Sequence, residues 1–504
     1  MATKPYYLTT PLYYVNSKPH IGHAYTNILC DTFARFHHLM GEPVFLLTGT
    51  DEHGTKIDKA AKEAGKNPKE FVDGIVPEFK KLWEALNIKY DYFIRTTDPE
   101  HKAAVQKILQ DLEKKGDVYK GKYKGWYCTP CESFWTALQL KEGKCPDCGR
   151  DVVPLEEENY FFKLSQHQDW LIKYIKDTPG FIHPESRQNE ILGFLREPLE
   201  DLCITRPKNR LSWGIPYPGS DQHVVYVCFD ALVNYISIQD YPKVPKNIWP
   251  GVHMIGKDIL RQHAVYWPIM LKAIGLPVPQ KIIAHGWWTF QGAKMSKSIG
   301  NVIDPLEMVQ KYSADGLRYY LLKEVSLGSD GTYSEDLMTE RFNTDLANDL
   351  GNLVSRSTAM LEKYFDLIIP EATQTGAVFQ KSYALEITPQ LIQGMQEYNP
   401  RDVLQIIWKY ITESNRFIEN TKPWVKAKEG KKEDLARIIY TLMESLRFIG
   451  IWLQPFLPTS AAKILYSLGY DKEIPFKEAA EWGKLKAGTK IKKSEILFPK
   501  LETK

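Results

Sequence analysis

The sequence lacks the features that would set it apart from ordinary globular proteins. It contains no uninterrupted run of about 18 apolar residues, the length at which a membrane-spanning helix is expected. Its first residues form neither an apolar secretory segment nor an arginine-rich transit segment, which predicts a cytosolic protein. It also has no internal repeat and no low-complexity tract, so a repeat solenoid is not expected.

Cysteine and net charge are both low. Of 504 residues only 7 are cysteine, and 65 basic residues stand against 62 acidic ones, which gives a net charge of +3. With so little net charge, a polyanionic partner such as RNA has to be bound by local patches. Four cysteines stand in two Cys-x-x-Cys pairs, which in a cytosolic chain favours a metal site over disulfides. The other three, Cys30, Cys203 and Cys228, are expected to be thiols.

Length and hydrophobic patterning bound the architecture. A chain of this length exceeds one hydrophobic core, so three or four compact units are expected. Residues 5–50 predict a β-α-β unit, with strands at 6–9 and 44–47 and a helix at 21–40 that Gly41 terminates. The apolar residues of this helix recur at helical spacing: Ile21, Tyr25, Ile28, Phe36 and Leu39.

The rest of the chain predicts an interrupted sheet followed by helices. A stretch rich in Gly, Cys, Lys and aromatic residues from about residue 121 looks like an insertion, after which strands resume at 224–229, 252–255 and 282–284. The C-terminal third is expected to be an antiparallel helix bundle with a lysine-rich, solvated tail after Trp482. One helical stripe of this bundle comprises Leu346, Leu350, Leu353, Val354 and Leu361.

Two short motifs, about 270 residues apart, carry the chemistry of phosphate binding. Residues 20–23 read His-Ile-Gly-His at the expected start of a helix, where backbone N–H groups and the helix dipole favour a phosphate. Residues 294–298 read Lys-Met-Ser-Lys-Ser on a separate loop, where two ammonium groups can bind departing pyrophosphate. The alternative is two surface histidines and a solvated lysine loop. The expected ATP-binding residues are His20, Gly22, His23, Lys294, Ser296 and Lys297, of which the two histidines and two lysines are the expected catalytic residues.

Four cysteines have the spacing of a metal site. Cys128 and Cys131 form one pair, Cys145 and Cys148 form the second, and thirteen residues separate the two pairs. Four thiolates close a tetrahedral shell without an open position, so the expected ion is one structural Zn²⁺. Thiols without metal, or two local disulfides, are the alternative. A nucleic-acid-reading zinc finger is disfavoured because the histidine pair and the following helix of that motif are absent.

These motifs, in this order, resemble the class I aminoacyl-tRNA synthetases. Segments 11–16, 230–235 and 256–259, together with Asp51, resemble the methionyl-tRNA synthetase family in particular. The resemblance implies a ligase that converts methionine and ATP, with Mg²⁺, to methionyl-adenylate and pyrophosphate. It implies transfer of the methionyl group to the terminal adenosine of tRNA(Met), initiator tRNA included. The implied methionine-binding residues are Leu12, Tyr14, Asp51, Ala231, Tyr235, Ile259, His263 and Trp267, with Asp51 binding the α-ammonium.

The resemblance also assigns residues in the helical third and marks one departure. Asn352, Arg356 and Trp424 match the residues with which the family reads the anticodon, and an exposed indole can stack on an unpaired base. The family usually has a tryptophan where this chain has Cys228. Either the pocket is looser for methionine, or Cys228 is simply a small buried residue of a strand. The chain has no room for the appended domain that dimerises some relatives, so a monomer without membrane contact is expected.

The predicted fold class is α/β: a Rossmann-like parallel-sheet catalytic domain with a zinc-binding insertion, followed by an α-helical anticodon-binding bundle. The expected boundaries are 1–118 and 221–290 for the halves of the catalytic domain, 119–220 for the connective insertion, 291–345 for the lysine-loop and stem-contact region, and 346–504 for the bundle. Two rivals stay open. One is another ligase of the same nucleotidyl-transferring superfamily, and the other is a non-enzymatic RNA-binding protein that would not turn over ATP.

Overall fold

The structure is a computed structural model that describes residues 4–129, 133–135, 137–146, 148–240, 247–290, 293–294, 303–371, 378–493 and 495–502. The chain forms two compact units. The first unit comprises Met1–Cys30, Val44–Glu84 and Lys89–Gly286. The second unit comprises Asp31–Pro43, Ala85–Ile88 and Trp287–Lys504. No helix in the described part of the chain is long and apolar enough to cross a membrane.

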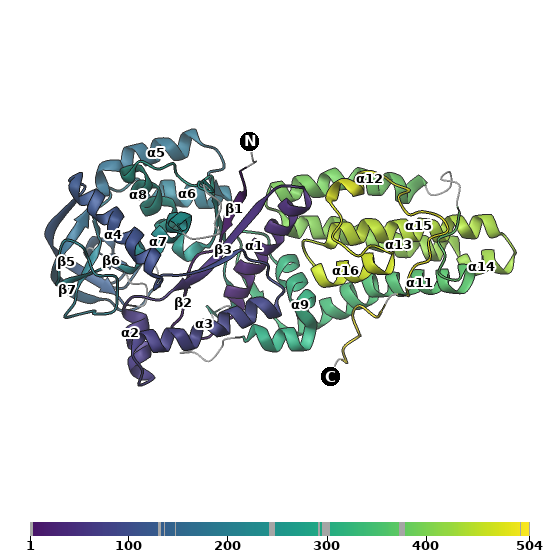
Figure 1. Ribbon diagram of the computed structural model, residues 1–504, viewed down its shortest axis with the longest axis horizontal. Coiled ribbons are helices and arrows are strands. Elements are labelled where there is room, and N and C mark those ends of the chain that lie inside the picture. The colour runs from purple at the N-terminus through teal and green to yellow at the C-terminus, as the bar shows by residue number, and fades with distance from the viewer. Residues whose placement is uncertain are drawn as a thin grey trace. The chain divides into compact units, whose positions relative to one another are not determined.

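A seven-stranded parallel sheet forms the centre of the first unit (Figure 1). Its order is β2-β3-β1-β12-β13-β8, with β4 paired to β3. The strands are β1 (Tyr6–Thr9), β2 (Tyr13–Tyr14), β3 (Val44–Asp51), β4 (Tyr92–Arg95), β8 (Ile182–His183), β12 (Val252–Gly256) and β13 (Lys281–His285). The expected strands at 6–9, 44–47, 252–255 and 282–284 are therefore confirmed. Because both faces of such a sheet are covered, most residues of these strands are apolar.

Helices join these parallel strands. They are α1 (Ile21–Leu39), α2 (Thr55–Glu63), α3 (Pro68–Ala85), α4 (Pro99–Lys114), α5 (Gln168–Asp177), α6 (Glu185–Phe194), α7 (Val227–Ser237) and α8 (Trp267–Ile274). The five apolar residues expected to share one face of α1 are all buried, and Gly41 has a φ of 86°, as a helix terminator requires. The boundary between the two units falls within α1.

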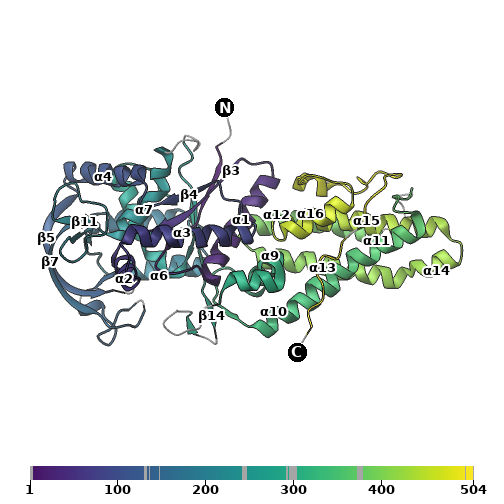
Figure 2. The same ribbon diagram turned by 60° about the horizontal axis from the view of Figure 1, so that its bottom comes forward.

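The insertion contains an antiparallel sheet of its own, in the order β6-β5-β7-β9. The strands are β5 (Val118–Cys128), β6 (Ser133–Trp135), β7 (Val153–Phe162) and β9 (Leu202–Cys203). Figure 2 shows β5 and β7 as long neighbouring strands. Lysines of β5 stand opposite glutamates of β7, and the Lys120 ammonium lies 2.8 Å from the Glu158 carboxylate. Such cross-strand charge pairs fix the register of the ribbon.

One expected strand is wrong. Residues 224–229 are not a strand of the parallel sheet, because β11 (His223–Val225) ends early and pairs antiparallel with β10 (Thr205–Pro207). The following residues begin α7, nearly all of whose side chains are buried. A helix buried on all sides has a continuous apolar sequence, which in a short segment cannot be distinguished from a buried strand. Conversely, β8 lies within the stretch 119–220 and yet pairs with β13.

The second unit is mainly helical. A three-stranded sheet, in the order β15-β14-β16, precedes the bundle. Its strands are β14 (Trp288–Phe290), β15 (Ala293–Lys294) and β16 (Gly331–Tyr333). The helices are α9 (Pro305–Glu324), α10 (Glu335–Arg341), a π-helical segment (Phe342–Gly351), α11 (Asn352–Phe365), α12 (Val378–Gln396), α13 (Pro400–Thr421), α14 (Pro423–Lys428), α15 (Lys432–Leu453) and α16 (Pro458–Ser467). All five leucine and valine residues of the expected stripe are fully buried, which confirms the helix pattern.

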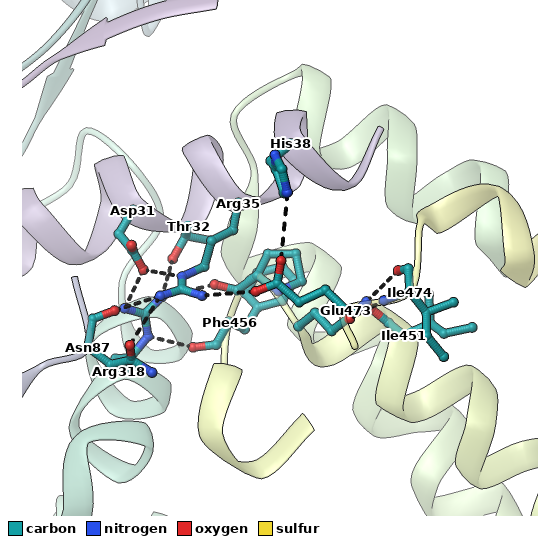
Figure 3. Close-up of polar contacts among 12 residues, drawn as sticks. Asp31, Thr32, Arg35, His38, Asn87, Arg318, Ile451, Phe456, Glu473 and Ile474 are labelled. Carbon is teal, nitrogen blue, oxygen red and sulfur yellow. Dashed lines mark hydrogen bonds and ion pairs between the residues drawn. The ribbon is translucent and has the colours of Figure 1, made fainter. Parts of the chain in front are cut away.

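A buried cluster of charges ties three segments of the second unit together (Figure 3). The Arg318 guanidinium of α9 lies 2.7 Å from the Asp31 carboxylate of α1 and donates to the backbone oxygens of Pro455 and Phe456, at 2.9 and 2.8 Å. Arg35 also lies 2.7 Å from Asp31. Because a buried charge is tolerated only when it is paired and hydrogen-bonded, this cluster fixes α1, α9 and the turn before α16 to one another.

The sequence had predicted a solvated lysine-rich tail, but several residues of this tail pack against the bundle. Leu485, Ile491 and Phe498 are buried. The Leu485 backbone N–H donates to the Glu444 carboxylate of α15 at 2.6 Å, and the Tyr440 hydroxyl donates to the Leu485 carbonyl at 2.9 Å. Widely spaced apolar residues, which no helical or strand period connects, hold the tail on the bundle.

Candidate active site

The site lies where the parallel strands end. β1 has β3 on one side and β12 on the other, so the direction of the connections reverses at β1. In open α/β sheets, ligands bind at the carboxyl ends of the strands beside such a reversal. Asp51 ends β3, residues 10–14 follow β1, and residues 257–259 follow β12. The topology therefore gathers segments that are up to about 250 residues apart in the sequence at one edge of the sheet.

The histidine pair stands at the start of α1, as expected. The rings of His20 and His23 stack with centroids 3.8 Å apart. The Gly22 N–H donates to Nδ1 of His20, and the His20 N–H donates to Nδ1 of His23, each at 3.1 Å. A ring that accepts at Nδ1 carries its proton on Nε2. Both histidines are thereby held in the tautomer whose Nε2–H can donate to a phosphate oxygen.

Glycine is required between the two histidines by the close approach of the His20 ring. A Cβ atom on Gly22 would lie 2.9 Å from Cε1 of His20, closer than real contacts allow. Burial, and then the proximity of His20, lowers the pKa of His23 well below its ordinary value of 6.5. The imidazole is therefore neutral at physiological pH. This helix start therefore offers N–H donors and the helix dipole to an anion, and no imidazolium charge on His23.

Aromatic rings cluster around Tyr235, His263 and Trp267, three of the residues expected to bind methionine. The Tyr235 hydroxyl lies 2.7 Å from Nε2 of His263, and Nδ1 of His263 lies 2.9 Å from the Ile259 carbonyl. The rings of Tyr235 and Trp267 have centroids 5.9 Å apart. His263 belongs to a π-helical segment (Gln262–Tyr266) that directly precedes α8. Such segments are frequent at functional sites because they re-aim a side chain.

The protonation of this cluster follows from burial. Burial lowers the pKa of His263 to about 4, so its ring is neutral, and it raises the pKa of Tyr235 well above the ordinary value. Because a carbonyl only accepts, Nδ1 of His263 carries the proton and donates to Ile259. Nε2 then accepts from the Tyr235 hydroxyl. The cluster of Tyr235, His263 and Trp267 is therefore uncharged.

The sequence missed several residues of this cluster. The ring centroid of His253, in β12, lies 4.0 Å from that of Tyr235. Nε2 of His253 accepts a hydrogen bond from the Trp267 indole at 3.2 Å, and Nδ1 lies 2.7 Å from the Thr9 hydroxyl. Trp249 stacks edge-on against Trp267 at 5.8 Å. A histidine inside an apolar strand is the only signal the sequence carried for His253, and for an isolated histidine that signal is weak.

The remaining pocket residues are only partly buried. Leu12, Tyr14, Cys228 and Ile259 pack against the core cluster that contains Tyr235 and Trp267, and Ala231 is also partly buried. Cys228 lies in the first turn of α7. The alternative that it is a small, buried residue of a strand is therefore wrong on both counts, its burial and its strand position. Like Leu12, Tyr14 and Ile259, it packs against the large core cluster of the first unit.

Asp51 is buried, and the residue after it is held by many donors. The Glu52 carboxylate accepts two hydrogen bonds from the Arg95 guanidinium, at 2.6 and 2.9 Å, and one each from the hydroxyls of Thr50 and Thr97, at 2.7 and 2.6 Å. Four bonds to one buried carboxylate fix its position. The segment that follows Asp51 is therefore rigid, although sequence spacing gave no reason to pair Glu52 with Arg95.

Three of the four expected zinc ligands are described, and they converge. The sulfur atoms of Cys128, Cys145 and Cys148 all lie within 4.8 Å of one another, with Cys128 and Cys148 at 3.6 Å. Sulfurs of a tetrahedral shell with Zn–S bonds of about 2.3 Å lie about 3.8 Å apart, so the set fits zinc. Cys131 lies outside the described residues. Cys30, Cys203 and Cys228 are thiols, as expected.

The lysine loop is mostly outside the described residues. The Lys294 backbone belongs to β15, whereas Ser296 and Lys297 are among the residues that the structure does not describe. In the bundle, Asn352 is exposed at the start of α11, and Trp424 of α14 is 42% exposed. The Arg356 guanidinium lies 2.6 Å from the Glu419 carboxylate of α13. All three side chains are on the surface of the bundle, where an RNA loop can reach them.

Comparison with known proteins agrees with this geometry. The chain matches the family described as tRNA synthetases class I (M) over residues 6–153 and 151–358, and the anticodon binding domain of methionyl tRNA ligase over residues 377–504. It is 48% identical over 509 residues to the methionine–tRNA ligase of Caldanaerobacter subterraneus subsp. tengcongensis, covering 99% of this chain and 79% of that protein. The corresponding ligase of Thermotoga maritima is 45% identical over 510 residues, covering 99% and 81%.

A solved structure matches as well. The methionyl-tRNA synthetase of Mycobacterium tuberculosis, in complex with methionyl-adenylate, is similar with a TM-score of 0.94 and 37% sequence identity, covering 99% of this chain and 100% of that chain. Sequence relatives, family matches and fold thus agree over the whole chain. The chain belongs to the methionyl-tRNA synthetase family of class I aminoacyl-tRNA synthetases.

Proposed function

We propose that this enzyme joins methionine to tRNA(Met), initiator tRNA included, in two steps. The methionine carboxylate attacks the α-phosphorus of ATP and releases pyrophosphate, and the terminal adenosine of the tRNA then takes the methionyl group. The observation that carries the proposal is the uncharged aromatic cluster of Tyr235, His263 and Trp267, in the same unit as the buried Asp51 at the end of β3. Uncharged rings suit the thioether, and a carboxylate suits the α-ammonium.

The roles in adenylate formation follow from the donors. His20 and His23 bind the phosphates through their Nε2–H groups, and the N-terminus of α1 adds backbone donors. Lys294, Ser296 and Lys297 bind the pyrophosphate as it leaves. Because phosphoryl transfer needs positioning and charge stabilisation more than covalent catalysis, no nucleophile of the protein is required. Mg²⁺ accompanies ATP and neutralises part of its charge.

The methionine pocket uses Leu12, Tyr14, Ala231 and Ile259 as its partly buried wall. Tyr235, His263 and Trp267 form the buried end. Asp51 accepts the α-ammonium. Zinc, held by Cys128, Cys131, Cys145 and Cys148, stabilises the insertion, and Trp126, Leu140 and Val152 pack against this cluster as an apolar shell. One zinc per chain by metal analysis, lost in Cys145→Ser but kept in Cys203→Ala, tests this assignment.

Asn352, Arg356 and Trp424 read the anticodon from the surface of the bundle. Their amide, guanidinium and indole groups are the types that bond to and stack on unpaired bases. We place the boundaries between the catalytic halves, the connective insertion, the lysine-loop region and the bundle after residues 118, 220, 290 and 345. A monomeric state and a cytosolic location remain predictions of the sequence, and light scattering during gel filtration tests the first of them.

Pyrophosphate exchange tests the proposed function directly. Labelled pyrophosphate should enter ATP when methionine is present and not with any other standard amino acid, and charging of tRNA(Met) should follow. Exchange that depends on a different amino acid would show that the chain has the activity of another ligase of the superfamily. If no amino acid supports pyrophosphate exchange, only the non-enzymatic RNA-binding role is left.

A further inference from the structure

A buried hydrogen-bonded network joins the two segments that carry the methionine-binding residues. We propose that Asp230, with His53 and His101, positions Asp51 relative to Ala231 and Tyr235, and so sets the affinity for methionine. We call His53, Asp230, His101 and Ser237 the Asp230 network. The inference rests on the proposed function, because it assigns positioning residues for the same amino-acid pocket.

The contacts of the network are short and fully enclosed. Asp230 Oδ2 lies 2.7 Å from Nδ1 of His53, and Oδ1 lies 2.7 Å from Nε2 of His101. Nδ1 of His101 lies 2.9 Å from the Ser237 hydroxyl. All four side chains are buried. Burial alone would raise the pKa of Asp230, but the charge and hydrogen bonds of His53 and His101 lower it below its ordinary value.

The ionised state of Asp230 fixes the protons of its partners. A carboxylate only accepts, so His53 donates from Nδ1 and His101 donates from Nε2. Hydrogen bonds to a charged acceptor are the strong ones, and two of them on one carboxylate restrain three segments at once. These segments are the loop after β3, the first turn of α7 and the first turn of α4. Figure 1 shows α4 and α7 side by side.

Two of these three segments, the loop after β3 and α7, adjoin or carry proposed methionine-binding residues. His53 is two residues after Asp51, and Asp230 is the residue before Ala231 and lies in the same helix as Tyr235. On its other side the loop is fixed by Glu52 and by the Trp213 indole, which donates to the Glu52 carbonyl at 2.5 Å. Because this loop is held on both sides, it can move only as a rigid body. The hydrogen bond from His53 to Asp230 therefore sets the position of the loop, and of Asp51, relative to α7.

Nothing in the proposed chemistry uses these groups directly. All four side chains are enclosed in the core. A buried charge with two histidine partners is costly to assemble, and apolar residues would pack α4 against α7 equally well. The network supplies what apolar packing does not, namely a direction-specific restraint on the strand end that carries Asp51.

The experiment separates positioning from plain stability by comparing two Michaelis constants. Asp230→Asn keeps the shape but places an N–H group against an imidazole N–H. In pyrophosphate exchange we expect the KM for methionine to rise about tenfold, with kcat and the KM for ATP within about twofold of wild type. A partly unfolded enzyme would instead lose kcat, with both KM values unchanged.

Conservative variants sharpen the test and do not require Asp230→Asn to fold. Asparagine places its amide nitrogen near the position of Nδ1, and glutamine near that of Nε2. We therefore expect His53→Asn and His101→Gln to retain a methionine KM within about threefold of wild type, and His53→Ala and His101→Ala to raise it about tenfold. Equal effects of the matched and the alanine variants would overturn the proposal.

Glu444→Gln is the matched control. Glu444 is a fully buried carboxylate of α15 that accepts from Arg447, at 2.9 Å, and from a backbone N–H. The Glu444→Gln variant should have a lower melting temperature and an unchanged methionine KM. If Asp230→Asn lowers the melting temperature and leaves the methionine KM unchanged, the network is only structural. If wild type itself shows no methionine-dependent exchange, the proposed function fails, which is a different result.

Discussion

Asp31 and Arg318 form an ion pair without any exposed surface, with Oδ2 and Nη1 2.7 Å apart. Figure 3 shows the guanidinium surrounded by the Asp31 carboxylate and by backbone oxygens. Burial lowers the pKa of Arg318, and the Asp31 charge opposes this shift. Each ion therefore depends on the other, and the removal of one leaves an uncompensated buried charge.

Asp31→Asn should lower the free energy of unfolding of the second unit by about 3–5 kcal/mol. Thermal or urea unfolding, followed by near-ultraviolet circular dichroism, measures the change. Asp177→Asn is the control, because Lys173 and Asp177 lie 2.6 Å apart but are 78% and 59% exposed, so its effect should stay below about 1 kcal/mol. Similar effects of the two variants would show that burial is not what makes the Asp31 pair matter.

Gly22→Ala should abolish most of the activity without loss of stability. The new Cβ would displace the His20 ring, so we expect kcat/KM for ATP in exchange to fall by about 100-fold. Alanine has the higher helix propensity by about 1 kcal/mol, so the melting temperature should not fall. Gly74→Ala in α3 is the control, because its Cβ would meet nothing within 4 Å. An active Gly22→Ala enzyme would remove the steric argument.

Stability should fall as the pH is lowered through the range set by His263. Its folded-state pKa is about 4, below the value of 6.5 for an exposed histidine, so between these pH values the unfolded chain binds more protons. The free energy of unfolding is then lower at pH 4 than at pH 7, by about 3 kcal/mol from this group. His263→Gln should flatten the dependence of the melting temperature on pH between 7 and 4. An unchanged slope would contradict the lowered pKa.

The sequence predicted those parts of the fold and site that depend on local pattern. The first β-α-β unit, the Leu346 stripe and the position of His20 and His23 follow from periodicity and from the chemistry of a helix start, both of which act over a few residues. Pairings across hundreds of residues did not follow. His53 and His101 find Asp230 only because the sheet brings α4, α7 and the end of β3 together. Spacing in the chain encodes no such distance.

Where local pattern failed, burial is the reason. Residues 224–229 are apolar because α7 is enclosed on all sides, and such a segment has no amphipathic period to identify it as a helix. The same enclosure hid His101, which lies on the buried face of α4 with Val105 and Leu109. A histidine among apolar residues at helical spacing was the available signal. Its partner could not be named without the fold.

Cys228→Trp should lower the KM for methionine. Cys228 lies partly buried at the start of α7, against the core cluster that contains Tyr235 and Trp267, and a sulfhydryl covers less apolar surface than an indole. We expect a several-fold decrease in the methionine KM, since each buried methylene group contributes about 0.8 kcal/mol. Cys203→Ala, at a buried thiol outside the pocket, is the control. An unchanged or raised KM would show that the cysteine does not loosen the pocket.

Arg356→Ala should weaken tRNA charging and leave adenylate formation intact. Arg356 lies on the surface of α11 and pairs with Glu419, so its loss exposes no core and should change the melting temperature little. If its guanidinium bonds to an anticodon base, the KM for tRNA(Met) should rise about tenfold or more, since such a contact contributes about 1–3 kcal/mol. Methionine-dependent pyrophosphate exchange should stay at the wild-type rate, because it needs no tRNA.

Arg416→Ala, which removes another exposed arginine from the neighbouring α13, separates base recognition from a general loss of positive charge. Equal losses in the two variants, or a shallower salt dependence of tRNA binding for Arg356→Ala than for wild type, would mean that Arg356 contributes charge alone and reads no base.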